Sequence, residues 1–355
     1  MSKSGVILQI LELARWAPSG DNTQCWRFEL VDGAHFVVHG FDTREHCVYD
    51  LDGHPSQISL GALFETIAIA ASAHGMRTDI VRRSGSDPQR PEFDVYLAAD
   101  AAVAPSPLIG SITLRSVQRR PLQMRPLTPT EKCALEAALG AGFEVQWLEG
   151  LSVKWRTARM MFNNAKLRLS MPEAYEVHRR VIHWGVERSP DRVPDQALGV
   201  DALTLRLMQW AMLSWGRLSL INTLMGTWGP RLQMDFVPGI ACAAHFVLKA
   251  KTQPSTIDDY VAAGRAVQRF WLTVTQLGLF MQPEMTPLIF SKYVREGRHF
   301  THARALHAQA AKLQQQTDKL IFTDAGCPVY MGRLGAGEAP RARSERRALE
   351  ELIWR

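Results

Sequence analysis

The feature that most constrains the fold is a pair of matched helical segments. "GALFETIAIAASAHG" occupies residues 61–75 and "GRAVQRFWLTVTQLG" occupies residues 264–278, and both are apolar with a glycine at each end at identical spacing. Each follows strand-like sequence and precedes more of it, and a short helix leading into a strand opens each half. Because this order occurs twice, the sequence favours a duplicated α+β unit. The alternative is a coincidence between two unrelated apolar helices.

Periodicity and turn residues predict the other elements. Alternating apolar residues indicate strands, and apolar residues three or four apart indicate helices. Asp32-Gly33 is a hairpin turn signal, whereas Thr128-Pro129 and Gly140 are typical of a helix start and a helix end. The expected helices cover 6–16, 58–74, 128–140, 258–277 and 302–320, and a hairpin over 26–40 is joined by expected strands over 77–85, 92–100, 143–150, 240–249 and 327–335.

An extra segment lies between the two halves. Residues 155–238 are longer than any connection that a repeat requires, and they carry Trp210, Trp215 and Trp228 among many Met and Leu residues. The segment is either a helical pair packed on the core or a lid that excludes water and holds a flat substrate beside a cofactor. We therefore expect a first half over 1–110 and a second half over 111–355 that contains this insertion.

Composition excludes several classes of function. The formal net charge is +6, but Lys and Arg are scattered apart from an Arg-rich tail, so we expect no nucleic-acid partner. Five separated cysteines without a C-x-x-C pair predict neither disulfides nor a zinc site, as is typical of a cytoplasmic protein. The first helix carries Glu12 and Arg15 in its apolar pattern, and no run reaches about 18 uncharged apolar residues, so we expect no signal peptide and no membrane partner.

Two polar segments remain after the common catalytic motifs are excluded. No G-x-G-x-x-G follows a strand, no P-loop lysine or G-x-S-x-G is present, and His299, His302 and His307 lack a partner at ligand spacing, so no metal is expected. The first segment, "PSGDNTQCW" at 18–26, is either a tight corner or a loop that presents a hydroxyl and amides. The second, "LRSVQRRPL" at 114–122, is either a charged linker or a phosphate grip.

Four segments in order carry a family resemblance. "PSGDNTQCW" resembles the P-S-x-x-N-x-Q-P-W loop of the FMN-dependent nitroreductase superfamily, and "RSVQRRPL" is similar to its R-S-x-R motif in the R-x-x-x-R-R-P form of fused, single-chain members. "GRAVQRFWLTVTQLGLFMQP" resembles the central dimer helix, and "PVYMGRLGAGEAPRARSERRALEEL" resembles the last strand and closing segment. Only the insertion lies outside the match. Cys25 replaces the usual proline, and Ser116 is one residue out of register.

The resemblance implies an α+β, nitroreductase-like fold in which two degenerate repeats form an intramolecular pseudo-dimer. Members of the superfamily are usually homodimers with flavins at the interface, each held by the arginine motif of one subunit and the loop of the other. Here the first half keeps only the loop, and the second half keeps only the arginines. We therefore expect a monomer with one complete FMN site.

The resemblance also implies roles for single residues. Arginines would bind the FMN phosphate, loop residues from the other half would hold the ribityl chain and ring edge, and residues after the late strand would run beside the ring. No residue is expected to transfer protons in catalysis. The expected cofactor residues are Pro18, Ser19, Asn22 and Gln24 in the loop, Arg115, Ser116, Arg119 and Arg346 at the phosphate, and Pro283, Glu284 and Met285 beside the ring, with Trp210, Trp215 and Trp228 as the lid.

The function that follows is an FMN oxidoreductase. It would pass hydride from NADH or NADPH to a flat, conjugated or electron-poor small molecule. Two alternatives stay open on the sequence alone: a protein that stores FMN under a closed lid, and a flavin-dependent dehydrogenase in a biosynthetic pathway.

Overall fold

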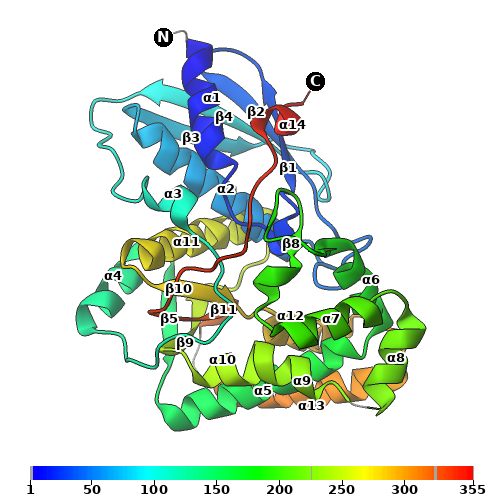
Figure 1. Ribbon diagram of the computed structural model, residues 1–355. Coiled ribbons are helices and arrows are strands. Elements are labelled where there is room, and N and C mark those ends of the chain that lie inside the picture. Colours follow the sequence, from blue (N-terminus) through cyan, green and yellow to red (C-terminus); the bar gives the residue numbers. More distant parts are fainter. Residues whose placement is uncertain (1–2, 225, 324–325, 355) are drawn as a thin grey trace.

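Two four-stranded antiparallel sheets organise the chain (Figure 1). The computed structural model describes residues 3–224, 226–323 and 326–354. Within each sheet, the strands can be numbered one to four by their order along the chain. In both sheets they then lie side by side in the order first, second, fourth, third. The sheets are β1 (Trp26–Leu30), β2 (His35–Gly40), β4 (Glu92–Ala99) and β3 (Met76–Arg82), and β5 (Phe143–Leu148), β9 (Ala244–Ala250), β11 (Cys327–Gly335) and β10 (Phe280–Pro283).

The matched helices cross each other between the two sheets. They are α2 (His54–Ser72) and α11 (Ile257–Gln276), and each connects the second and third strands of its own sheet. A Cβ atom at Gly61 would lie 2.0 Å from the carbonyl oxygen of Val261, and a Cβ atom at Gly264 would lie 2.0 Å from that of Ile58. Because any side chain would collide with backbone there, the first glycine of each matched segment is a contact point of the crossing.

Most predicted elements lie close to their expected places. The first helix is α1 (Lys3–Ala14), and α4 (Pro129–Leu139) begins with a capping box in which the Thr128 hydroxyl accepts from the Glu131 amide. The later helix is α13 (Arg304–Ile321). The strand expected from residue 240 is β9 and begins only at Ala244, because residues 237–240 form the short helix α10 (Val237–Ile240).

Each sheet packs on its helices in a separate apolar core. Trp26, Phe36 and Phe64 are fully buried in the first core, and Phe246 and Phe270 are fully buried in the second. The segment after β11 returns to the first sheet and ends in α14 (Leu349–Leu352), whose two leucines complete the first core. The closing residues of the chain therefore belong to the packing of the first half (Figure 1).

The insertion forms a helical layer under the second sheet (Figure 1). Between its helices, residues 182–200 form a loop with short strands that rises toward the first half; we call these residues the cover segment. The layer contains α5 (Leu151–Leu169), α6 (Pro172–Val181), α7 (Ala202–Ala211), α8 (Trp215–Leu224), α9 (Trp228–Arg231), a π-helix (Leu232–Phe236) and α10, and it packs with α12 (Thr286–Arg295) and α13. The cover segment contains β6 (Ile182–His183), β7 (Arg188–Ser189), β8 (Val193–Pro194) and a 3-10 turn (Asp195–Leu198).

Candidate functional site

The loop between α1 and β1 is strained. Asp21, Asn22 and Gln24 have φ values of +52°, +62° and +51°, and they are the only non-glycine residues with positive φ in the described part of the chain. Such conformations cost free energy and persist where the surroundings enforce them. Here the Ser19 hydroxyl accepts from the Gln24 amide at 2.9 Å, and the Thr23 hydroxyl donates to the Gly20 carbonyl at 2.7 Å. The strain is therefore concentrated in the segment that the sequence singled out.

The strained loop buries two amide side chains against the cover segment. The Asn22 amide nitrogen donates to the Pro190 and Arg192 carbonyls, at 3.2 and 3.3 Å. The Gln24 amide nitrogen donates to the same Pro190 carbonyl at 2.8 Å, and its oxygen accepts from the Arg347 amide at 2.9 Å. The Asn22 side-chain oxygen is buried and has no hydrogen-bond partner among the described residues. The loop thus retains one buried, unused acceptor.

Arg115 lies close to this loop, just after the short helix α3 (Ser111–Leu114). Its side chain is 3% exposed, donates to the Trp16 carbonyl at 2.9 Å, and stacks 4.6 Å from the centre of the Trp271 ring. Burial is the main cause that lowers the pKa of Arg115 to about 9, and repulsion from Arg343 is the second. Its Nε is buried without a partner in the described chain. Arg115 is therefore a buried cation that no carboxylate of the described residues neutralises by direct contact.

Two arginines of the C-terminal segment join Arg115. Arg343 donates to the Thr113 and Arg115 carbonyls at 3.0 and 3.2 Å, and its Nε is also buried and unpaired. Arg346 donates to the Ala17 carbonyl at 3.0 Å. Burial and repulsion from Arg115, Arg343 and Arg15 hold the pKa of Arg346 well below its usual value. A group of buried and half-buried guanidinium ions, two of them with an unpaired donor, is a good site for an anion.

Of the arginines expected at the phosphate, Arg115 and Arg346 lie near each other, whereas Arg119 has other neighbours. Arg119 donates to the Ala197 carbonyl of the cover segment at 3.2 Å. Burial lowers the pKa of Arg119 to about 10, and the charges that act on it are Asp21, Arg333 and Arg168. Ser116 lies half-buried between the two arginines. Arg343 was not predicted individually, since the sequence offered only an Arg-rich tail.

Pro283 ends β10, Glu284 and Met285 follow it, and the side chain of Glu284 is turned inward. Its carboxylate, 3% exposed, lies 2.7 Å from Nδ1 of His245 and accepts from Arg333 at 3.0 Å. The other ring nitrogen of His245 lies 2.7 Å from the Gly239 carbonyl, so both nitrogens face acceptors and the ring is an imidazolium. Burial alone would lower the pKa of His245, but the Glu284 carboxylate outweighs burial and raises it to about 10.

This buried triad has one anion and two cations. The backbone amide of Glu284 donates to the Met331 carbonyl at 2.8 Å, and the Met285 sulfur accepts from the Met331 amide at 3.5 Å. Residues 283–285 are thus fixed to β11. The net positive charge behind them was not predicted, because His245 and Arg333 lie in strand sequence where nothing marks them as partners.

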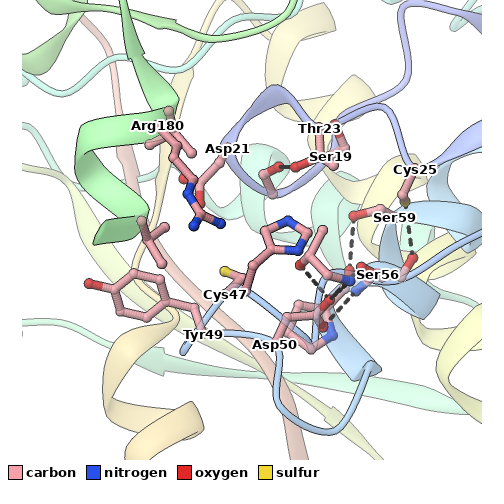
Figure 2. A pocket seen from close by; sticks show the side chains of 16 residues that line it. Ser19, Asp21, Thr23, Cys25, Cys47, Tyr49, Asp50, Ser56, Ser59 and Arg180 are labelled. Carbon is pink, nitrogen blue, oxygen red and sulfur yellow. Dashed lines mark hydrogen bonds between the residues drawn. The ribbon is translucent and has the colours of Figure 1, made fainter. Parts of the chain in front are cut away.

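A cavity of about 140 Å³ opens beside the loop, between the start of α2 and α6 (Figure 2). Cys25 and Asp50 are both on its wall. The Asp50 carboxylate accepts from the Ser56 and Thr43 hydroxyls at 2.6 and 2.8 Å, and the Cys25 thiol donates to the Ser56 carbonyl at 3.7 Å. Burial raises the pKa of Cys25, so it stays a neutral thiol. Cys25 is a packing residue of this wall and not a nucleophile.

Ionisable side chains of the insertion also face the loop. Arg168 on α5 lies 3.4 Å from Asp235, and burial raises the pKa of Asp235 to about 6. Burial is the main cause that lowers the pKa of His178 to about 3, and repulsion from Arg168 is the second. The ring is therefore neutral and can accept a hydrogen bond from the Tyr49 hydroxyl at 3.1 Å. Among the residues that the structure describes, no group of three or more His, Cys, Asp or Glu side chains could hold a metal ion.

The three tryptophans of the expected lid lie elsewhere in the insertion. Trp210 and Trp228 are 45% and 59% exposed, and Trp215 packs on Tyr175 with ring centres 5.6 Å apart. The part of the insertion that contacts the loop is the cover segment, which contains polar residues and turn residues. The sequence pointed to the tryptophans because aromatic content was the visible signal, whereas the cover segment has no such signal; a lid role for Trp210, Trp215 and Trp228 stays a prediction.

Comparisons with known proteins give a partial picture. No family model matches the chain. One curated relative, "Uncharacterized protein MT1398" of Mycobacterium tuberculosis (strain CDC 1551 / Oshkosh), is 24% identical over 348 residues, which is 95% of this chain and 47% of the relative. The chain thus spans about half the length of the curated relative that it matches.

Three solved structures overlap part of the chain. They are a nitroreductase-like family protein from Bacillus cereus (11% identity, 70% of this chain and 95% of that one, TM-score 0.35), a nitroreductase with bound FMN from Bacteroides fragilis (10%, 68% and 95%, TM-score 0.36) and the FMN-dependent nitroreductase NfnB from Mycobacterium smegmatis in complex with NADPH (13%, 68% and 94%, TM-score 0.35). At TM-scores this low, the architecture of the chain rests on its own elements.

Proposed function

We propose that the chain binds one FMN where its two halves meet, and that it is an oxidoreductase that moves hydride from NADH or NADPH to a flat, conjugated or electron-poor molecule. The observation that supports this most is the group of three arginines, buried Arg115 with half-buried Arg343 and Arg346, next to the strained loop of residues 18–25. The reaction itself would be that of the cofactor, because no proton-transferring pair is assigned to the chain.

The unused polar atoms of the site fit this cofactor. The Nε groups of Arg115 and Arg343 are donors without partners, and a phosphate offers acceptor oxygens. The side-chain oxygen of Asn22 is an acceptor without a partner, and the pyrimidine edge of a flavin offers an N–H donor. A neutral apolar ligand would satisfy none of these three atoms. The unpaired donors and the unpaired acceptor are thus of the kinds that the phosphate and the ring edge of FMN would engage.

Two features of the fold support the pseudo-dimer and the single flavin. The two sheets have the same strand order, and α2 crosses α11 at equivalent glycines. The connection from α1 to β1 holds the Asn22 loop, whereas the corresponding connection from α4 to β5 has only Gly140, Ala141 and Gly142. Three small residues cannot present an amide and a hydroxyl. We therefore propose two degenerate repeats with one intact site.

The residues of the chain have separable roles in this proposal. When bound, FMN supplies hydride acceptance and donation. Arg115, Arg343 and Arg346 anchor the phosphate, the 18–25 loop holds the ring edge, and the cover segment excludes water. The cations His245 and Arg333, in direct contact with the Glu284 carboxylate, give this triad a net positive charge behind residues 283–285, which would favour negative charge that develops near them.

FMN storage is a second candidate, because the cover segment is firmly attached. Pro190 accepts from both loop amides, β7 pairs with β12 (Arg343–Ser344), and Arg347 forms an ion pair with Asp191 at 3.2 Å. A cover held in this way would retain a flavin and keep a nicotinamide away from it.

Anaerobic mixing of the FMN-loaded protein with NADH or NADPH separates the two candidates. Loss of the yellow flavin absorbance within seconds is expected for the oxidoreductase. Bleaching by dithionite but by neither nicotinamide would overturn the oxidoreductase in favour of storage.

The phosphate site is tested by flavin retention. Arg115→Ala combined with Arg343→Ala removes both unpaired donors, and the protein is expected to lose its FMN on gel filtration. The matched control is Arg120→Ala, because Arg120 is exposed in the same segment. Equal retention by the double variant and the control would mean that the phosphate binds elsewhere.

A further inference from the structure

Helix α7 has an apolar face that is turned away from the protein. Leu203, Leu207 and Trp210 lie on one stripe of the helix and are 77%, 39% and 45% exposed. Leu205 and Met208 lie on the opposite side and pack against the small apolar cluster of the cover segment. The helix therefore has enough apolar residues for its own packing without the outer stripe.

Helix α8 continues this surface. None of its residues is fully buried, and Leu220 and Leu224 are 54% and 74% exposed. They share a stripe with Arg217, whose guanidinium lies 5.0 Å from the centre of the Trp210 ring on α7. This contact joins the two stripes. We call Leu203, Leu207, Trp210, Arg217, Leu220 and Leu224 together the α7–α8 face.

The charge around the α7–α8 face has one sign. Residues 202–234 contain three arginines and no aspartate or glutamate. Arg231 is buried and donates to the Phe162 carbonyl, so the exposed charges are those of Arg206 and Arg217. Asp201 precedes the segment, where it caps α7 by accepting from the Leu203 and Thr204 amides. An apolar surface with cations only is complementary to an apolar partner that carries negative charge.

We propose that the α7–α8 face binds the surface of a membrane that contains anionic lipids. The leucines and Trp210 would enter the boundary between headgroups and acyl chains, and Arg206 and Arg217 would contact the anionic headgroups. No helix in the described part of the chain is long and apolar enough to cross a membrane, and the sequence-based expectation of no membrane partner rested on that length. A pair of helices that lies flat on the membrane surface does not need that length.

A second copy of the chain fits this face less well. Two identical faces brought together by a twofold axis would place the arginines of both copies in one interface with no carboxylate from residues 202–234 to neutralise them. Like charges in a desolvated interface are destabilising. Anionic lipid supplies the charge that a second copy lacks.

Vesicle sedimentation of the full chain tests the proposal. Vesicles of equal parts phosphatidylglycerol and phosphatidylcholine are expected to bind the protein, with weaker binding at high salt, and vesicles of phosphatidylcholine alone are expected to bind it poorly. Leu203→Glu combined with Leu220→Glu is expected to weaken binding about a hundredfold, because two apolar contacts are lost and two negative charges are added.

A matched variant controls for charge. Leu30→Glu combined with Val81→Glu adds the same charge at half-exposed positions of the first sheet and is expected to bind as the parent does. Circular dichroism checks that both variants are folded. Failure of the parent to bind anionic vesicles, or equal binding by the two double variants, would overturn the proposal. So would a dimer in solution that Leu203→Glu with Leu220→Glu converts to monomer. These measurements do not depend on flavin binding, so their outcome is independent of the proposed function.

Discussion

At the scale of single residues, the site depends on buried charges that only the folded chain brings together. Glu284 lies between His245 and Arg333 with both contacts at 3.0 Å or less, and all three side chains are almost fully buried. Such a carboxylate with two cationic partners contributes strongly to the free energy of unfolding. If the carboxylate or the cations are removed, the remaining charge is buried without a counter-charge in a medium of low dielectric constant.

Glu284→Gln is expected to destabilise the protein by about 3–5 kcal/mol, because buried His245 and Arg333 would lose the carboxylate that contacts both of them. The measurement is the free energy of unfolding in urea. Glu338→Gln is the control, since Glu338 is exposed. Unfolding midpoints that do not differ between the two variants would contradict the role given to Glu284.

The raised pKa of His245 predicts a pH dependence of stability. The folded state binds the imidazolium proton up to about pH 10, whereas the unfolded chain releases it near the usual value of 6.5. The contribution of this proton is therefore complete below pH 6.5 and is lost as the pH rises toward 10. The free energy of unfolding is expected to fall over that window in the parent and to fall less in His245→Gln, as measured by urea titrations at several pH values. Parallel pH profiles would argue against the imidazolium.

A local motif is what marked single residues in the sequence, and their assignment to a flavin site stays a prediction. Arg115 and Arg346 carried motifs, and the fold brings them together. Arg119 was paired with Arg115 because they share one motif, but the chain between them is extended, with a bridge from Val117 to Met281, so four residues span about 13 Å. His245 has no motif, and its pairing with Glu284 arises from the order of strands, which a local pattern does not contain.

At the scale of elements, periodicity and capping residues predicted most helices and strands. Thr128 and Gly140 bound α4 as expected, and β11 covers the expected residues. The cover segment was not predicted as an element, because residues 182–200 have neither helical nor strand periodicity. Its conformation comes from pairing with the C-terminal segment through β7 and β12, which is a contact between distant parts of the chain.

Because α2 and α11 cross closely, one added methyl group at the crossing is expected to lower the free energy of unfolding strongly. Gly61→Ala is expected to cost more than about 3 kcal/mol in the free energy of unfolding, because the new Cβ atom would lie 2.0 Å from the Val261 carbonyl oxygen and both helices would have to separate. Gly110→Ala is the control, since nothing lies within 4 Å of that Cβ position. Thermal unfolding compares them, and similar melting temperatures would show that the crossing is not tight.

At the scale of the whole molecule, the proposed pseudo-dimer with one flavin site predicts a stoichiometry and a mass. We expect one FMN per chain in the reconstituted protein and the mass of a single chain in solution, since α11 already occupies the surface of α2 that a second subunit would need. Flavin absorbance after denaturation, divided by protein concentration, gives the ratio, and light scattering gives the mass. Two flavins per chain, or a dimer that dissociates when flavin is removed, would contradict one site per chain.

The return of the C-terminal segment to the first sheet has a consequence for synthesis. Leu349 and Leu352 complete the first core, and the Trp354 amide donates to the Phe28 carbonyl. The first half of the chain leaves the ribosome long before these residues do. Its core therefore lacks these two leucines until residues 349–352 have been translated, and we expect the first sheet to complete its packing only after the second sheet has been synthesised.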